Sequence, residues 1–174
     1  MNNTKNYSLN KLIPRIIGIQ FRAAPGPVVI NTSMSVFHSL SWTAGLLASH
    51  RLFDAISNAA AGLLGFYDCV IPLLIMAGVT FGQQILNGIH NFFGWTYYIG
   101  KSGGVVKTLL HEKLQKIDPA RFEDTAFLDD LNKAREGIGP LSIISMTLLN
   151  IIFFYGVYFA SVGFYLFHLS YRCI

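Results

Sequence analysis

The hydrophobic positions of this chain fall into three long blocks without charged side chains. Asp, Glu, Lys and Arg are absent from Ala23–His50, Cys69–Gly100 and Gly137–Tyr171. Each block exceeds the roughly 20 residues that an α-helix needs to cross the hydrocarbon core of a bilayer. The pattern therefore predicts an all-α integral membrane protein. Its expected spans are at about residues 28–49, 69–98 and 141–160.

The last block leaves two alternatives open. Leu141–Leu169 is 29 uncharged residues long, more than one span requires. It forms either one tilted span or a span followed by a hairpin. For the hairpin, Gly156, Ser161 and Gly163 offer a turn, and a fourth span would start at 161–170. The expected count is therefore three or four spans.

The first span is the most polar of the set. A span that faces lipid all round would not carry many polar groups, because an unpaired polar group in hydrocarbon is costly. We therefore expect one of its faces to pack on other helices or to line a watery cavity. The polar positions are Asn31, Thr32, Ser33, Ser35, His38, Ser39, Ser41 and Thr43.

An N-terminal segment, residues 1–27, precedes this span and combines basic residues with an apolar stripe. Such a pattern is typical of a helix at the membrane surface. Pro14 is expected to interrupt that helix, and Pro25-Gly26-Pro27 to end it. The stripe is formed by Leu9, Leu12, Ile13 and Ile16, and the basic residues are Lys5, Lys11, Arg15 and Arg22.

The segments on either side of the second span differ in length and charge. His50–Asp68 reads as a loop, since its uncharged middle of 13 residues, 55–67, is too short to cross a bilayer. Beyond the membrane, the second helix is expected to continue through 105–117, although Gly103-Gly104 weakens that continuity. The predicted protein thus has long helical extensions on one side of the membrane.

The block 101–136 carries seven basic and seven acidic residues and cannot lie in lipid. Asp118-Pro119 predicts a helix start, and Asp124 predicts the cap of a second short helix. Gly137 and Gly139-Pro140 are expected to end that helix. Its apolar face would hold Phe127, Leu128, Leu131 and Ala134. The block is either a solvated loop or a docking element.

Charge placement predicts the orientation. The chain is 52% hydrophobic and 13% charged, far less charged than an average soluble domain. Eleven of the 13 basic residues lie before the first span or in block 101–136. By the positive-inside rule both regions are cytoplasmic, which predicts a multi-pass protein of the cell (inner) membrane with a cytoplasmic N-terminus. No pattern for nucleic-acid binding accompanies the basic residues.

Motifs for catalysis or metal binding are not found. None of the five histidines lies three or four residues from another, so no single helix face offers two metal ligands. Gly100-Lys101-Ser102 lacks the glycine and the preceding strand of a phosphate-binding loop. The expected catalytic, cofactor-binding and metal-binding residues in this chain are therefore none.

Two stretches of the charged block carry a resemblance. Leu114-Gln115-Lys116-Ile117-Asp118 and the run from Phe122 to Ala134, FEDTAFLDDLNKA, resemble the first intracellular region of ABC exporters, with the closest match in bacterial peptide and bacteriocin exporters. In that family a long second span leads into the cytoplasm, a short coupling helix follows, and a long third span returns. The resemblance implies that 28–174 is a partial transmembrane domain whose coupling region is 101–136.

The resemblance further implies a contact with an ATP-binding domain. The contact residues would be Glu123, Asp124, Phe127, Leu128 and Leu131. This sequence holds no phosphate-binding loop, so ATP and its hydrolysis would belong to a missing or separate nucleotide-binding domain. The chain then corresponds to a truncated exporter that works with further transmembrane helices or a second copy in the lipid bilayer. The alternative is a small, non-transporting membrane interaction or accessory protein.

Overall fold

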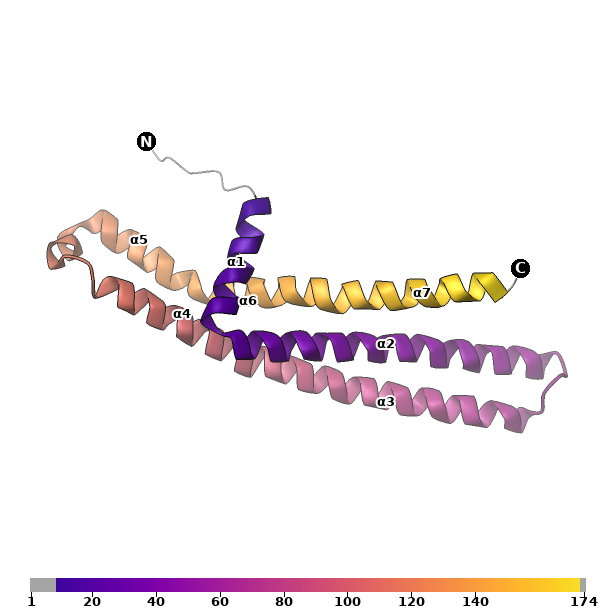
Figure 1. Ribbon diagram of the computed structural model, residues 1–174. Coiled ribbons are helices and arrows are strands. Elements are labelled where there is room, and N and C mark those ends of the chain that lie inside the picture. Colours follow the sequence, from indigo (N-terminus) through magenta and orange to yellow (C-terminus); the bar gives the residue numbers. More distant parts are fainter. Residues whose placement is uncertain (1–8, 173–174) are drawn as a thin grey trace. The chain divides into compact units, whose positions relative to one another are not determined.

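The computed structural model describes residues 9–172, and every regular element within that range is a helix (Figure 1). The chain forms two units. One combines the chain up to Asn31 with Phe93–Leu149, and the other combines Thr32–Phe92 with the chain from Asn150 onward. The prediction of an all-α chain is confirmed for the described residues. Residues 1–8 of the predicted N-terminal segment lie outside them.

Helix α1, Leu9–Ala23, runs through Pro14, so the interruption expected there is wrong. Proline removes the hydrogen bond to the carbonyl four residues earlier and crowds that carbonyl, which here lies in the first turn, where the helix is least constrained. Burial of Ile16, two residues later and 8% exposed, favours the continuous helix. The break before the next helix is a single residue, Ala24, which lies between α1 and α2.

Helix α2, Pro25–Ala60, begins directly after the break that was expected before the first span, and it corrects the loop that was expected after that span. Pro25-Gly26-Pro27 forms its first turn, where the missing proline N–H groups would have no helical partner in any case. The helix also continues through half of the predicted His50–Asp68 loop. His50 Nδ1 lies 3.1 Å from a carboxylate oxygen of Asp54 one turn later, and Ala55 is buried, so both helix faces are stabilised there.

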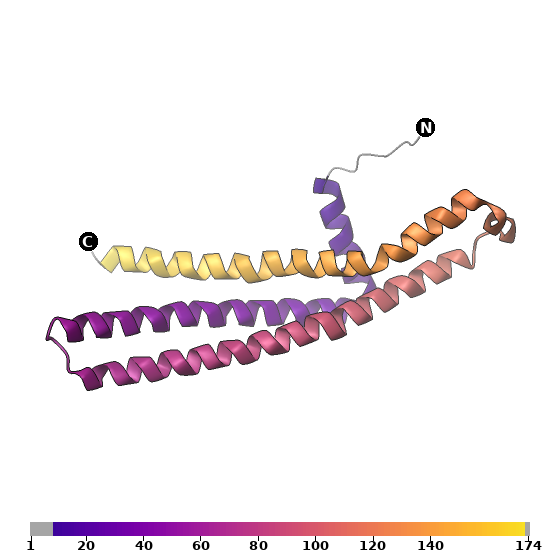
Figure 2. The ribbon, with the colours of Figure 1, turned by 180° about the vertical axis from the view of Figure 1, so that it is seen from behind.

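The loop after α2 is short, and Gly62 permits it. Gly62 has φ +75°, a left-handed conformation that other residues rarely adopt. A 3₁₀ turn, η1 (Phe66–Cys69), follows and leads into helix α3, Val70–Phe92. In the second unit, the part of α2 after Thr32 lies beside helix α3, as both Figure 1 and Figure 2 show.

The second apolar block forms one long helical run, as the sequence predicts. Helix α3 passes through a π-helical segment, η2 (Phe93–Tyr98), into α4 (Ile99–Leu114). Gly103-Gly104 does not interrupt it. A Cβ atom at Gly103 would lie 3.8 Å from Ser142 Oγ, so this glycine sits where another helix approaches. The whole run, Phe66–Leu114, is 49 residues long.

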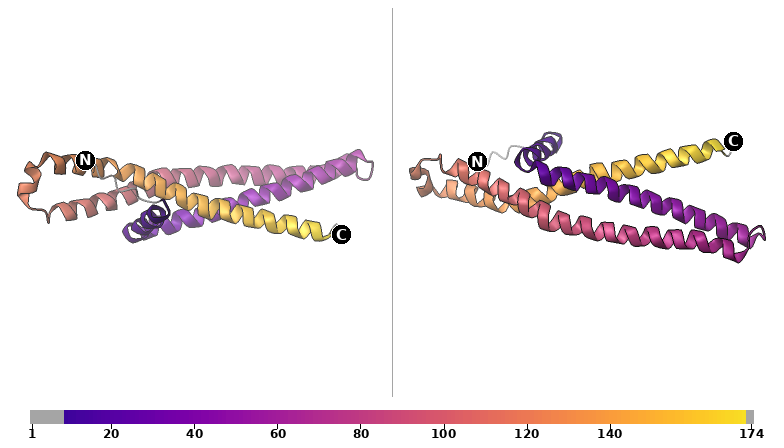
Figure 3. Two further views of the ribbon diagram at one scale, coloured as in Figure 1. Left: turned by 90° about the horizontal axis from the view of Figure 1, so that it is seen from above. Right: turned by 60° about the horizontal axis from the view of Figure 1, so that its bottom comes forward.

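The chain reverses at η3 (Pro119–Glu123) and returns through α5, Thr125–Glu136 (Figure 3). Gly137 ends α5, as expected, but Gly139-Pro140 lies inside the next helix, α6 (Ile138–Asn150). Proline is accepted there because it falls in the first turn of α6. Consequently α5 and α6 form an almost continuous helical run that is interrupted only at Gly137.

After α6 the chain stays helical to the end of the described residues. A π-helical segment, η4 (Ile151–Tyr155), leads into α7, Gly156–Arg172. Of the two alternatives for the third apolar block, the structure therefore has the uninterrupted helix without a turn at Gly156, Ser161 and Gly163, and 161–170 continues the same helix. The Ser161 hydroxyl bonds the carbonyl of Val157, 2.8 Å away, which satisfies this polar side chain within the helix.

Within residues 9–172, two helices are long and apolar enough to cross a membrane by length and composition, Phe66–Leu114 and Thr125–Ser170, the second 46 residues long. They contain the predicted spans at 69–98 and 141–160. The first predicted span, 28–49, belongs to α2, whose polar side chains lower its hydropathy. The count of three or four spans stays a prediction.

Candidate functional site

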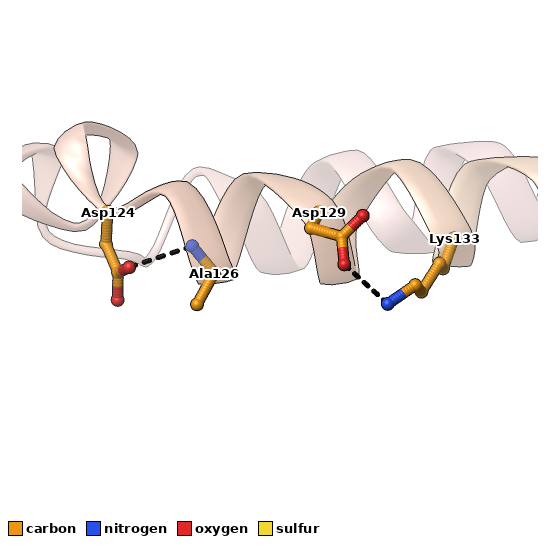
Figure 4. Close-up of polar contacts among 4 residues, drawn as sticks. All are labelled: Asp124, Ala126, Asp129 and Lys133. Carbon is orange, nitrogen blue, oxygen red and sulfur yellow. Dashed lines mark hydrogen bonds and ion pairs between the residues drawn. The ribbon is translucent and has the colours of Figure 1, made fainter. Parts of the chain in front are cut away.

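The tip between α4 and α5 is built by two aspartate caps, in the first unit. Asp118 accepts a hydrogen bond from the backbone N–H of Ala120, at 3.0 Å, and Pro119 begins η3. Asp124 accepts from the N–H of Ala126, at 2.9 Å, at the start of α5 (Figure 4). Each cap satisfies a backbone donor that the helix leaves unpaired. Both predicted helix starts are confirmed.

The predicted contact residues of α5 differ in exposure. Phe127 is half-buried and its ring meets that of Phe122 edge to face, with centroids 5.4 Å apart. Leu131 is also half-buried, whereas Leu128 is 37% exposed. Phe127 therefore packs within the tip, and Leu128 is the one large apolar side chain of α5 that is exposed.

Charged side chains surround this apolar position. Lys133 donates to a carboxylate oxygen of Asp129 one turn earlier (Figure 4). That hydrogen bond, together with the charge of Asp129, raises the pKa of Lys133. Glu123 is exposed beside the cap residue Asp124. The tip thus presents two exposed apolar side chains, Phe122 and Leu128, among solvated charged side chains.

A second cluster of polar side chains lies in the other unit and joins three helices. The hydroxyl of Ser35 in α2 donates to Oδ1 of Asn150 at the end of α6, 2.8 Å away. The same hydroxyl lies 3.2 Å from Nε2 of His90 in α3. The ring of His90 meets that of His38 edge to face, with centroids 5.5 Å apart. We call Ser35, His38, His90 and Asn150 the polar cluster.

His38 is itself oriented by a neighbour. The indole N–H of Trp42 donates to Nε2 of His38, 3.1 Å away and one turn later in α2. Since indole can only donate, Nε2 accepts, and the proton of the neutral ring is on Nδ1. On the other side the ring of Phe154 lies against His38 at 5.1 Å between centroids. The polar cluster is therefore closed by aromatic rings.

The polar face expected of the first span is used for packing on other helices. Gln83 of α3 donates to the carbonyl of Ser41, 2.7 Å away. Thr43 and Ser161 hydroxyls lie 2.7 Å apart. Gly45 makes room for Gln83, since a Cβ there would lie 2.2 Å from Gln83 Nε2. In the first unit, the buried Tyr98 hydroxyl similarly meets Ser145 at 3.0 Å.

The pairing of His38 with His90 is not predicted by spacing along one helix, because it joins two different helices. These residues are 52 positions apart and meet through packing of α2 on α3. Among the described residues no group of three or more His, Cys, Asp or Glu side chains is placed to hold a metal ion. One sequence feature did point to an internal contact, since both histidines lie within charge-free blocks, where a polar side chain needs a partner.

The comparisons with known proteins return no relatives. No protein-family model matches the chain, and neither a curated protein nor a solved structure matches it.

Proposed function

We propose that this chain is a membrane-spanning part of an ATP-driven exporter of the ABC type. In this proposal, α5 is a coupling helix that contacts a nucleotide-binding domain outside this sequence. The observation that carries the proposal is a short helix, capped at its start by Asp124, at the reversal between two long helical runs, the second of which it begins.

Membrane insertion is supported by apolar surface that the chain itself leaves uncovered. None of the described side chains in α3 is buried, although it is one of the most apolar helices. Ile71 and Phe81, for example, are 67% and 69% exposed. So much contiguous apolar surface is rare on soluble monomers, and lipid or further transmembrane helices would cover it. A second copy of the chain is one source of such helices.

Helix length supports the cytoplasmic extension. The two apolar helices contain 49 and 46 residues, more than twice the roughly 20 that cross a bilayer. The surplus includes the charged part of the chain, which is expected in the cytoplasm by the positive-inside rule. The tip would then stand away from the membrane surface, within reach of a soluble domain.

Coupling would be mechanical. Two capped helices and the Phe122–Phe127 ring contact hold the tip in one shape, so a push on α5 is transmitted to both long helices. Closure of nucleotide-binding domains would move α5, and the spans would rock to give alternating access. The polar cluster would hold α2, α3 and α6 together during that movement.

The test is co-purification with an ABC-type nucleotide-binding subunit expressed from the same genome. Leu128→Asp should abolish the complex, because it places a charge in the apolar contact while leaving the Phe122–Phe127 packing intact. Ala126→Asp is the matched control, since it adds the same charge on the opposite face of α5. Phe127→Asp is less specific because it also removes an internal contact.

Three outcomes are distinguishable. Loss with Leu128→Asp and retention with Ala126→Asp support the proposal. Equal binding by both variants places the contact elsewhere and contradicts the role of α5. Absence of any complex with the unmodified chain favours the alternative, a non-transporting membrane interaction protein.

A further inference from the structure

A cavity of about 420 Å³ in the first unit combines two cations with an aliphatic wall. Five of its lining residues come from α1, and the sixth comes from the first turns of α6. The lining residues are Lys11, Leu12, Arg15, Ile16, Ile19 and Leu141. The lining thus offers both positive charge and an aliphatic surface, whereas an ordinary gap between helices is either apolar throughout or polar and filled with water.

The cationic part is formed by Lys11 and Arg15, four residues apart and therefore neighbours on one face of α1. Both side chains are exposed. The sequence contains no Asp or Glu before Asp54, so α1 supplies no carboxylate that would neutralise them. Neither takes part in an ion pair among the described residues. Their charges are available to an anion.

The aliphatic part continues directly from the charges. Leu12, Ile16 and Ile19 follow the spacing of one helix face, and Leu141 closes the cavity from α6. Ile16 is 8% exposed, whereas Leu12 and Ile19 are each 36% exposed. A ligand that matches this surface carries an anionic group joined to a hydrocarbon chain.

We propose that this cavity binds an anionic phospholipid of the cytoplasmic leaflet. The phosphate lies between Lys11 and Arg15, and an acyl chain covers Leu12, Ile19 and Leu141. A free phosphate would leave the aliphatic wall bare, and an acidic peptide would have no fixed donors for its backbone in this lining. The bound lipid ties the interfacial helix to the helix that contains the third predicted span.

This inference needs a membrane but not ATP-driven transport. It therefore stands if the nucleotide-binding contact of α5 is disproved. The cytoplasmic leaflet is the one that carries anionic lipid, and basic residues near its surface gain binding energy from it. The position of Lys11 and Arg15 before the first predicted span agrees with that leaflet.

The test is native mass spectrometry of the full chain in detergent with equimolar phosphatidylglycerol and phosphatidylcholine. The unmodified chain should retain phosphatidylglycerol in preference, by roughly tenfold or more for two cations. Lys11→Gln/Arg15→Gln should remove the preference. Lys113→Gln/Lys116→Gln loses the same charge at exposed positions outside the cavity and should keep it.

Two further arms make the result specific. Lys11→Arg/Arg15→Lys retains both charges and should retain the preference, which shows that positive charge at these two positions is what selects the lipid. Millimolar inorganic phosphate should not displace the lipid, whereas Leu141→Asn should weaken its retention several-fold. Displacement by phosphate, or an unchanged preference in Lys11→Gln/Arg15→Gln, overturns the proposal.

Discussion

Ser35 donates a hydrogen bond to the side-chain oxygen of Asn150, 2.8 Å away, although 115 residues separate them in the chain. The same hydroxyl also meets His90, so one small side chain connects three helices. In an apolar environment such contacts specify which helix faces meet, because few alternative partners exist. The polar cluster thus specifies which faces of α2 and α3 meet each other and the end of α6 at Asn150.

Replacing Ser35 by alanine should destabilise the folded helices by about 1 kcal/mol, the usual net value of one such hydrogen bond. Ser33→Ala is the matched control, because Ser33 lies in the same helix with an exposed side chain. Its effect should be within a few tenths of a kcal/mol. Denaturation in mixed detergent micelles measures both, and equal effects would contradict the role of Ser35.

Gly45 should gain less stability from alanine than an open helical glycine does, because the new Cβ would lie 2.2 Å from Gln83 Nε2. Gln83 can swing aside but would give up its hydrogen bond to Ser41, a loss of about 1 kcal/mol that offsets the gain in helix propensity. Gly78→Ala in α3 is the control, since nothing lies within 4 Å of its added Cβ, and helix propensity should make it neutral or stabilising.

The Gly45 effect should disappear when its partner is shortened. In Gly45→Ala/Gln83→Ala the clash is absent, so the two changes should cost less together than the sum of the single changes. Thermal unfolding of all three variants measures this coupling. Strict additivity would mean that Gly45 and Gln83 do not meet.

The cap of α5 should matter for local order at the tip. Asp124→Ala removes the acceptor for the Ala126 N–H and should cost about 1 kcal/mol of local stability, while Asp124→Asn keeps an acceptor and should cost little. Hydrogen exchange of the α5 amides reports the difference. Asp130→Ala, an exposed acid without a capping role, should leave the first-turn amides unchanged.

Lys133 should titrate above the ordinary lysine pKa of 10.5, because Asp129 accepts its hydrogen bond. A raised pKa means that the pair stabilises α5 fully below that ordinary value and ceases to do so as the pH rises through the raised value. The NMR titration of the Lys133 side chain should shift downward in Asp129→Asn. An identical titration in both proteins would show that the pair does not form in solution.

Local sequence signals predicted the tip and the long helical run before it, but not the uninterrupted length of the helix after it. Asp118 and Asp124 act on backbone groups two residues away, so their caps were readable from sequence. Gly156 and Gly163 suggested a turn, yet the helix continues, since an isolated glycine costs only about 1 kcal/mol and intrahelical hydrogen bonds outweigh it.

Contacts between segments that are far apart in the sequence could not be predicted from local sequence signals. The polar residues of 28–49 predicted that some partner face exists, and the structure places Ser35, His38 and Thr43 against other helices. Which helix each one meets depends on how the helices pack, and no spacing rule within one helix encodes that. The exposed state of Leu128 likewise depends on Phe127 turning toward Phe122.

The most direct test of the proposed function is a photo-crosslinker placed at Leu128. The chain is expressed in cells together with its genome's ABC-type nucleotide-binding subunits, and cross-linked peptides are identified by mass spectrometry. The account predicts a cross-link from position 128 to a nucleotide-binding domain and none from position 126. Cross-links from position 128 only to other membrane proteins, or equal cross-linking from both positions, would contradict it.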